Sequence, residues 1–232
     1  MTVLEAVDLG KTYTGGDGGL LSVLDGVNLQ VARGEMVAIV GASGTGKSTL
    51  LHLLGALDRP TRGSVSIDGE RLEDRSDEEL SILRNRRIGF VFQFHHLLRE
   101  FSALENVMMP LRIGGWETQR ARGRAEELLS RVGLAGRMSH RPSELSGGEQ
   151  QRTAVARALA IDPAVLLADE PSGNLDHANS ERLHDLFVEL SRDLEIAMVV
   201  VTHNRSLALR ADRALLLEEG RLTDTGVREV LA

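Results

Sequence analysis

The chain has 232 residues, of which 42% are hydrophobic, so it is long enough to bury a large core, with or without a smaller subdomain. Its formal net charge of -7 argues against a general nucleic-acid binder, and we expect no nucleic-acid partner. It contains no cysteine, which excludes disulfides, thiolate metal sites and cysteine nucleophiles and fits a reducing compartment such as the cytoplasm.

Secretion and membrane insertion are also disfavoured. Residues 1–10 lack the basic-then-apolar arrangement of a secretory signal. The most apolar runs, at 196–201 and 214–217, fall far short of the ~20 residues that span a bilayer. We therefore expect any membrane role to depend on a partner.

The first part of the chain predicts a small antiparallel β layer. Apolar and polar residues partly alternate over 3–13 and 21–31, as in half-buried strands, and the glycine-rich run at 15–19 forms the loop between them. A further strand at 64–67 ends at a turn, Asp68-Gly69.

A glycine-rich loop lies between an apolar run at 36–40 and a helix whose leucines recur at helical spacing. It fits G-x-x-x-x-G-K-[ST] at every fixed position, with the residues Gly41-Ala42-Ser43-Gly44-Thr45-Gly46-Lys47-Ser48-Thr49. Glycines let the backbone curl round a triphosphate, and the helix start adds partial positive charge. We expect Lys47 to reach the β- and γ-phosphates and Ser48 to bind Mg²⁺. The alternative, a glycine-rich turn that binds nothing, is disfavoured because motif and context agree.

The middle of the chain is predicted to be mainly helical. Ser76 and Glu79 form a capping-box pair that opens a helix, and a buried strand at 88–92 ends at Gln93. Residues 94–162 carry helical patterns at 124–132 and 149–160 but no strand signal. We assign 94–162 to a helical subdomain inserted between the two parts of a nucleotide-binding core, 1–93 and 163–232, within a single domain.

The last part of the chain alternates strands with helices. Strands are expected at 164–168, 196–201 and 213–217, with a helix between the first two, a turn at 219–220 and a short terminal helix. This order predicts an α/β fold with a mainly parallel sheet covered by helices.

Two acids follow the strand at 164–168. Asp169 can hold Mg²⁺, directly or through water, and Glu170 can polarise an attacking water, which are the two functions that a phosphate cradle requires for hydrolysis. An ordinary exposed acidic turn is the alternative. The loop at 41–49 favours the functional interpretation.

A second glycine-rich stretch, Leu145-Ser146-Gly147-Gly148-Glu149-Gln150-Gln151-Arg152, precedes a helix and is a weak anion-site signal by itself. Together with 41–48, 165–170 and His203, it occurs in the order and spacing of ATP-binding cassette (ABC) ATPases, which the chain resembles over nearly its whole length. The resemblance implies a P-loop NTPase (RecA-like) core in the ABC ATPase fold, and hydrolysis of ATP to ADP and phosphate with Mg²⁺.

The same resemblance implies roles for single residues. Tyr13 would stack on adenine, Gln93 would link Mg²⁺ and water to the transport partner, and His203 would contact the γ-phosphate. The alternatives are a side chain of the β layer for Tyr13, an amide that ends a strand for Gln93 and a loop residue without a catalytic role for His203. The nucleotide itself would be held by Gly41, Ser43, Gly44, Thr45, Gly46, Lys47, Ser48 and Thr49.

Four further residues are implied to serve a second copy of the chain. Ser146, Gly147 and Gly148 would contact the ATP held by the partner in a head-to-tail dimer, and Asp176 would meet the partner subunit. Glu149 departs from the commonest form of this signature, which has Gln, so roles carried over to position 149 are doubtful.

The run Gln93-Phe94-His95-His96-Leu97-Leu98, with residues 101–107 and Pro110, looks like the lipoprotein-releasing branch of the family. That branch implies two integral membrane partners and a peripheral position on the cytoplasmic face of the bacterial inner membrane. Macrolide-type efflux and cell-division ATPases are the alternatives. A metal site at His95 and His96 is disfavoured because no further ligand is evident nearby. We expect the apolar residues of 94–101 to form a groove for a short helix of the membrane subunit, with burial in the helical subdomain as the alternative.

Overall fold

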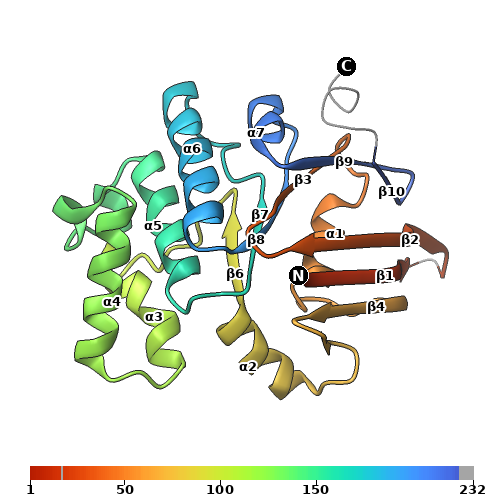
Figure 1. Ribbon diagram of the computed structural model, residues 1–232, viewed down its shortest axis with the longest axis horizontal. Helices are drawn as coiled ribbons and strands as arrows, with labels where there is room; N and C mark the ends of the chain where they lie inside the picture. Colours follow the sequence, from red (N-terminus) through yellow and green to blue (C-terminus); the bar gives the residue numbers. More distant parts are fainter. Residues whose placement is uncertain (17, 225–232) are drawn as a thin grey trace.

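The computed structural model describes residues 1–16 and 18–224 and contains two β-sheets with helices around the larger one (Figure 1). None of the helices in these ranges combines the length and hydropathy that a membrane crossing requires. The expected terminal helix lies outside the described residues. The predicted fold class, a mainly parallel sheet with an N-terminal antiparallel layer and a helical region, is confirmed.

The smaller sheet is the predicted antiparallel layer. Its strands follow the order β2 (Leu20–Ala32), β1 (Thr2–Thr14), β4 (Arg62–Ile67) and β5 (Glu70–Arg71). Asp68 and Gly69 join β4 to β5 with φ angles of 49° and 79°, so both positions of this tight turn are left-handed, as a type I′ turn requires. All neighbouring strands in this sheet run antiparallel.

The larger sheet has the order β10 (Arg221–Thr223), β9 (Arg213–Glu218), β3 (Met36–Val40), β8 (Ala197–Val201), β7 (Val165–Asp169) and β6 (Ile88–Phe92). The five strands from β9 to β6 are parallel, and β10 returns antiparallel to β9. Parallel strands place their carboxyl ends along one edge, so the residues that follow β3, β6, β7 and β8 meet there. The sequence did not predict β10.

Each face of the larger sheet has its own hydrophobic core, because successive side chains of a strand point to opposite faces. Val37 and Ile39 of β3 belong to the cluster that contains the leucines of α1 (Lys47–Leu54) and the inner face of the β layer. Met36, Ala38 and Val40 belong to the other cluster, with Phe187 of α6 (His177–Asp193). The sheet is therefore buried on both faces, which explains its continuous apolar strands.

The helical region contains α3 (Ala103–Ile113), α4 (Thr118–Arg131) and α5 (Gly147–Leu159), which pack on one another on the left of Figure 1. We did not predict α3 as a separate helix. The boundaries of the subdomain, 94 and 162, stay a prediction.

Helices α4 and α5 begin earlier in the sequence than predicted. Helix α4 begins at Thr118, well before residue 124, because the Glu117 carboxylate accepts hydrogen bonds from the N–H groups of Gln119 and Arg120. Helix α5 begins at Gly147 because Ser146 is its N-cap. Helix α2 (Asp77–Arg87) opens with the predicted Ser76–Glu79 capping box. A short helix, α7 (Arg205–Arg210), lies between β8 and β9.

Candidate functional site

A hollow of about 750 Å³ opens at the carboxyl edge of the larger sheet, where β3 passes into α1. It brings together most of the predicted nucleotide residues from segments far apart in the sequence. Its lining consists of Tyr13, Leu21, Val23, Gly41, Ser43, Gly44, Gly46, Lys47, Ser48, Thr49, Gln93, Asp169, Glu170 and His203.

Two glycines of the loop are required by close packing. A Cβ atom at Gly41 would lie 2.4 Å from the carbonyl oxygen of Leu217, and one at Gly46 would lie 2.9 Å from Val23 Cγ1. Gly46 also has a φ of 98°, which favours glycine. Gly44, with a φ of 83°, meets no other atom within 4 Å at its Cβ position, so the loop is open at this residue. The loop can therefore follow the surface of a phosphate chain closely.

The ammonium group of Lys47 lies inside the loop. Its Nζ atom donates hydrogen bonds to the carbonyl oxygens of Gly41 and Ala42, both at 2.8 Å. Thr45 also turns back on the loop, because its hydroxyl donates to Ala42 at 3.0 Å. A cation held among backbone carbonyls at a helix start suits an anionic ligand, whose oxygens can replace these carbonyls as partners.

The donor set beside the loop fits a magnesium ion. Ser48 lies in the first turn of α1 and Asp169 at the end of β7, and both residues line the hollow. Burial raises the pKa of the Asp169 carboxyl above its ordinary value, and the neighbouring Ser48 side chain opposes that shift. A hydroxyl, a carboxylate and the nearby Gln93 amide oxygen are the hard oxygen ligands that Mg²⁺ prefers, and a bound dication would remove the cost of charging Asp169.

Glu170 and His203 lie together at the ends of β7 and β8. The Nδ1 atom of His203 is 2.9 Å from Glu170 Oε1. The other carboxylate oxygen of Glu170 accepts hydrogen bonds from the Thr202 hydroxyl at 3.1 Å and from the His203 N–H at 3.2 Å. Glu170 itself has a φ of 43°, a left-handed conformation that is uncommon for a residue with a side chain. The carboxylate is thus fixed in orientation in the lining of the hollow.

Gln93 is held by a residue that the sequence analysis did not single out. Its Nε2 atom donates to Asn174 Oδ1 at 3.0 Å, and the Asn174 amide donates back to the Gln93 carbonyl at 3.2 Å. Gly173 allows this approach, since a Cβ atom there would lie 2.9 Å from Gln93 Nε2. Asn174 lies two positions before Asp176, and this closeness to a predicted site residue was the available signal.

Tyr13 lines the hollow from β1, together with Leu21 and Val23 of β2, which the sequence analysis did not assign to the site. The Tyr13 hydroxyl donates to Asp58 Oδ2 at 2.8 Å, and burial and this carboxylate raise the pKa of the phenol. The ring is therefore neutral and tethered at its tip, and one apolar side of the hollow is available for a flat base.

Ser146, Gly147, Gly148 and Asp176 do not line this hollow. The first three begin α5 and Asp176 caps α6, whereas the phosphate loop begins α1 on the other side of the strands (Figure 1). The first turns of α5 and α6 contact each other, because a Cβ atom at Gly148 of α5 would lie 2.7 Å from Oδ1 of Asn179 in α6. A single chain thus keeps these residues apart from its own phosphate loop.

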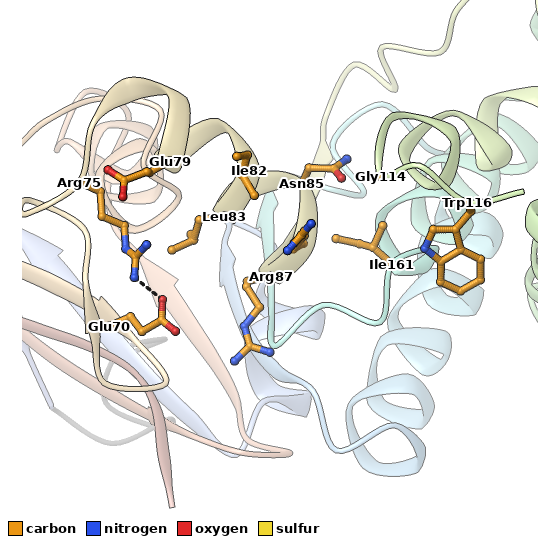
Figure 2. Close-up of a pocket in the computed structure, with 11 residues that line it drawn as sticks. Glu70, Arg75, Glu79, Ile82, Leu83, Asn85, Arg87, Gly114, Trp116 and Ile161 are labelled. Atoms are coloured by element: carbon orange, nitrogen blue, oxygen red, sulfur yellow. Dashed lines mark hydrogen bonds and ion pairs between the residues drawn. The ribbon is translucent and has the colours of Figure 1, made fainter.

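Two other hollows border each other and share Asn85 and Ile161. One, of about 430 Å³, has apolar walls that include Phe90, Leu98 and Ile113. The other, of about 650 Å³, extends from the Glu70–Arg75 ion pair to Gly114 and Trp116 (Figure 2). Neither contains a glycine-rich phosphate loop, so the hollow at 41–49 remains the candidate nucleotide site.

His95 and His96 follow β6 (Ile88–Phe92), and no third potential metal ligand is grouped with them in the described residues. The ring of His96 packs edge-on against Phe92 at 5.4 Å between centroids. No group of three or more His, Cys, Asp or Glu side chains that could hold a metal ion occurs in the part of the chain that the structure describes.

Comparisons with known proteins agree with this geometry. The family model described as ABC transporter matches residues 24–173. Over 221 residues, the chain is 54% identical to the lipoprotein-releasing system ATP-binding protein LolD of Geobacter metallireducens, covering 95% of this chain and 98% of the relative. It is 56% identical over 222 residues to LolD of Xanthomonas campestris, covering 96% of this chain and 92% of that protein.

Solved structures of two relatives have the same fold. One is the ATP-binding cassette MJ0796 in a dimeric post-hydrolysis state bound to ADP and Pi, with 39% identity and a TM-score of 0.88 over 97% of this chain and 99% of that chain. CbiO1 of Clostridium perfringens, part of an ABC transporter complex, has 30% identity and a TM-score of 0.87 over 99% of this chain and 90% of that chain. The chain therefore belongs to the ATP-hydrolysing, ATP-binding proteins of ABC transporters, in the family that contains the LolD proteins.

Proposed function

We propose that this protein is the ATPase subunit of a lipoprotein-releasing ABC transporter and that it acts on the cytoplasmic face of the inner membrane through two integral membrane subunits. The observation that carries the ATPase part is the hollow that joins the loop at 41–49 to Gln93, Asp169, Glu170 and His203. The substrate and the partners are proposed from the LolD relatives, which are 54% to 56% identical to this chain.

In the proposed reaction, the loop and Lys47 hold the triphosphate, and Tyr13 offers a face to adenine. Ser48, Asp169 and Gln93 would hold Mg²⁺, which neutralises phosphate charge when bound. Glu170 accepts a proton from the attacking water, and His203, 2.9 Å from the same carboxylate, is proposed to contact the terminal phosphate.

The working form is proposed to be a head-to-tail dimer with two nucleotides at its interface. Ser146 and Gly147 are exposed at the start of α5 and lie outside the chain's own hollow, as a contribution to a second copy requires. The dimeric state of the relative MJ0796 bound to ADP and Pi supports this arrangement.

The membrane subunits are proposed to dock at the apolar hollow that includes Leu98. Phe94, Leu98 and Phe101 are exposed in the single chain, with 66%, 42% and 37% of their surface accessible. This exposure disfavours the alternative in which Phe94, Leu98 and Phe101 are buried in the helical subdomain. It also leaves an apolar surface that suits a short helix.

Copurification from membranes tests the proposal. The tagged full chain should retain two integral membrane proteins, and the purified complex in lipid vesicles should release a lipoprotein into solution only with ATP. Retention of partners that export a small hydrophobic compound, or of cell-division proteins that transport nothing, would overturn lipoprotein release and favour the corresponding relatives.

A further inference from the structure

Glu149 of the second glycine-rich stretch is tied to Ser146. Glu149 Oε2 accepts hydrogen bonds from the backbone N–H and from the hydroxyl of Ser146, both at 2.8 Å. The Glu149 N–H donates to Ser146 Oγ at 3.3 Å, which completes a capping box. In this state the Ser146 hydroxyl proton therefore points at the Glu149 carboxylate.

A cation from another element holds the same carboxylate. Arg137, at the end of the short 3₁₀ turn Ala135–Arg137, places its Nε atom 2.8 Å from Glu149 Oε1. The Arg137 and Ser146 hydrogen bonds lower the pKa of Glu149 to about 2, so the carboxylate is charged at neutral pH. Arg152 of α5 also attracts Glu149, and no direct bond joins these two residues.

The charge of Glu149 matters because Ser146 is proposed to meet a phosphate of the partner's nucleotide. A carboxylate one hydrogen bond away from that hydroxyl would repel the phosphate and would also compete for the hydroxyl proton. A Gln side chain would carry no such charge. An arginine on the far oxygen of Glu149 offsets the repulsion and weakens the pull of the carboxylate on the Ser146 proton, so that the hydroxyl can exchange this bond for one to the phosphate.

We propose that Arg137 is a positioning residue of the composite ATP site, which neutralises Glu149 so that Ser146 can bind the nucleotide of the second copy. The inference rests on the proposed head-to-tail dimer. Arg137 acts through Glu149 and Ser146 and does not itself contact the nucleotide.

The proposal predicts that removing Arg137 is harmful only while Glu149 is charged. We would measure ATP-dependent dimerisation of the full chain by sizing chromatography in a Glu170→Gln background, which slows hydrolysis. Arg137→Ala should raise the ATP concentration for half-maximal dimerisation about tenfold, on the order expected for one uncompensated charge near a phosphate. In a chain that also carries Glu149→Gln, the same Arg137→Ala change should shift that concentration less than about twofold.

Two controls isolate the mechanism. Arg122→Ala removes an arginine whose Nε atom is also 2.8 Å from a glutamate, Glu126, on the surface of α4, and it should not affect dimerisation. Labelled ATP should bind monomeric Arg137→Ala as it binds the parent chain, because the loop at 41–49 is intact. Arg137→Lys should recover part of the loss, since it retains the charge.

The outcomes separate the inference from the proposed function. If the parent Glu170→Gln chain forms no dimer with ATP, the composite site and this inference both fall. If the dimer forms but Arg137→Ala does not weaken it, or weakens it equally in chains with and without the Glu149→Gln change, the dimer stands and the role of Arg137 is overturned. An equal loss would mean that Arg137 only supports the local fold, which circular dichroism melting would report.

Discussion

The carboxylate of Glu170 and the imidazole of His203 lie 2.9 Å apart although the two residues are 33 positions apart in the sequence, because β7 and β8 are neighbouring parallel strands that end at the same edge. The Glu170 N–H also donates to the Val201 carbonyl at 2.9 Å, which ties the backbone of the acid to the strand that precedes the histidine. The role proposed for Glu170, a general base, requires a fixed orientation toward a water molecule, and the neighbouring strands fix the orientation of this side chain.

Lys47→Ala should abolish most ATP binding and turnover. The ammonium group already lies among loop carbonyls, and a charge-assisted contact of this kind contributes roughly 1.5–3 kcal/mol to binding. Titration with labelled ATP checks this, with Arg122→Ala on α4 as a control that removes an exposed positive charge. Unchanged affinity and rate would remove Lys47 from the site.

Asp169→Asn should stabilise the protein without nucleotide and prevent its response to Mg-ATP. Burial raises the pKa of this carboxyl, so charging it at neutral pH costs folding free energy that an amide does not cost. Each kcal/mol of folding free energy that the substitution recovers should raise the melting temperature by about 2–4 °C. Thermal unfolding with and without Mg-ATP checks both effects, with exposed Asp74→Asn as the control. A lower melting temperature in Asp169→Asn, or an unchanged response to Mg-ATP, would contradict the assignment.

The gain in melting temperature from Asp169→Asn should depend on pH, because the pKa of the Asp169 carboxyl is raised in the folded chain. A carboxyl whose folded pKa is raised holds its proton to higher pH in the folded chain, so the stability it contributes at low pH is lost as pH rises through the folded pKa. The gain in melting temperature from Asp169→Asn should therefore be full above the raised pKa and shrink as pH falls through the raised pKa toward the ordinary value of an aspartate. Melting curves across this range check it, and a gain that grows on acidification would refute the cause.

Leu98→Asp or Phe101→Asp should leave the isolated chain folded and able to bind ATP but reduce copurification with the membrane subunits and transport-coupled activity. Both side chains are exposed, so a carboxylate at either position has access to water in the single chain, whereas a docked helix would bury it. Leu209→Asp changes another exposed leucine, on α7, and is the matched control. Unfolding of the variants would favour burial in the subdomain, and normal docking and transport would exclude both alternatives.

Strong local patterns allowed much of the fold to be predicted from sequence. The strand at 36–40 and the capping box at Ser76 depend on residues close in the chain, and the structure has both. The start of α4 was wrong because Glu117 is a less usual N-cap than Ser or Asp. Strand β10 has only three residues and depends on pairing with β9, which a short sequence window does not reveal.

Long-range partners in the site were less predictable than the motifs. The structure gathers Lys47, Gln93, Asp169, Glu170 and His203 as the order of motifs suggested. The Gln93–Asn174 and Arg137–Glu149 pairs were not anticipated, because the partners are 81 and 12 positions apart and only the packed fold brings them together. The catalytic roles of the gathered residues stay predictions.

Phosphate release by the full chain in Mg-ATP, compared with the same measurement on Glu170→Gln, tests the central claim most directly. Loss of a general base typically slows turnover by about 10²–10⁴-fold, and ATP affinity should be unchanged because Glu170 is not proposed to hold the nucleotide. Exposed Glu189→Gln on α6 should release phosphate at the parent rate. The account predicts steady turnover in the parent and the control and near-complete loss in Glu170→Gln with ATP still bound. Equal phosphate release by the parent and Glu170→Gln would contradict it.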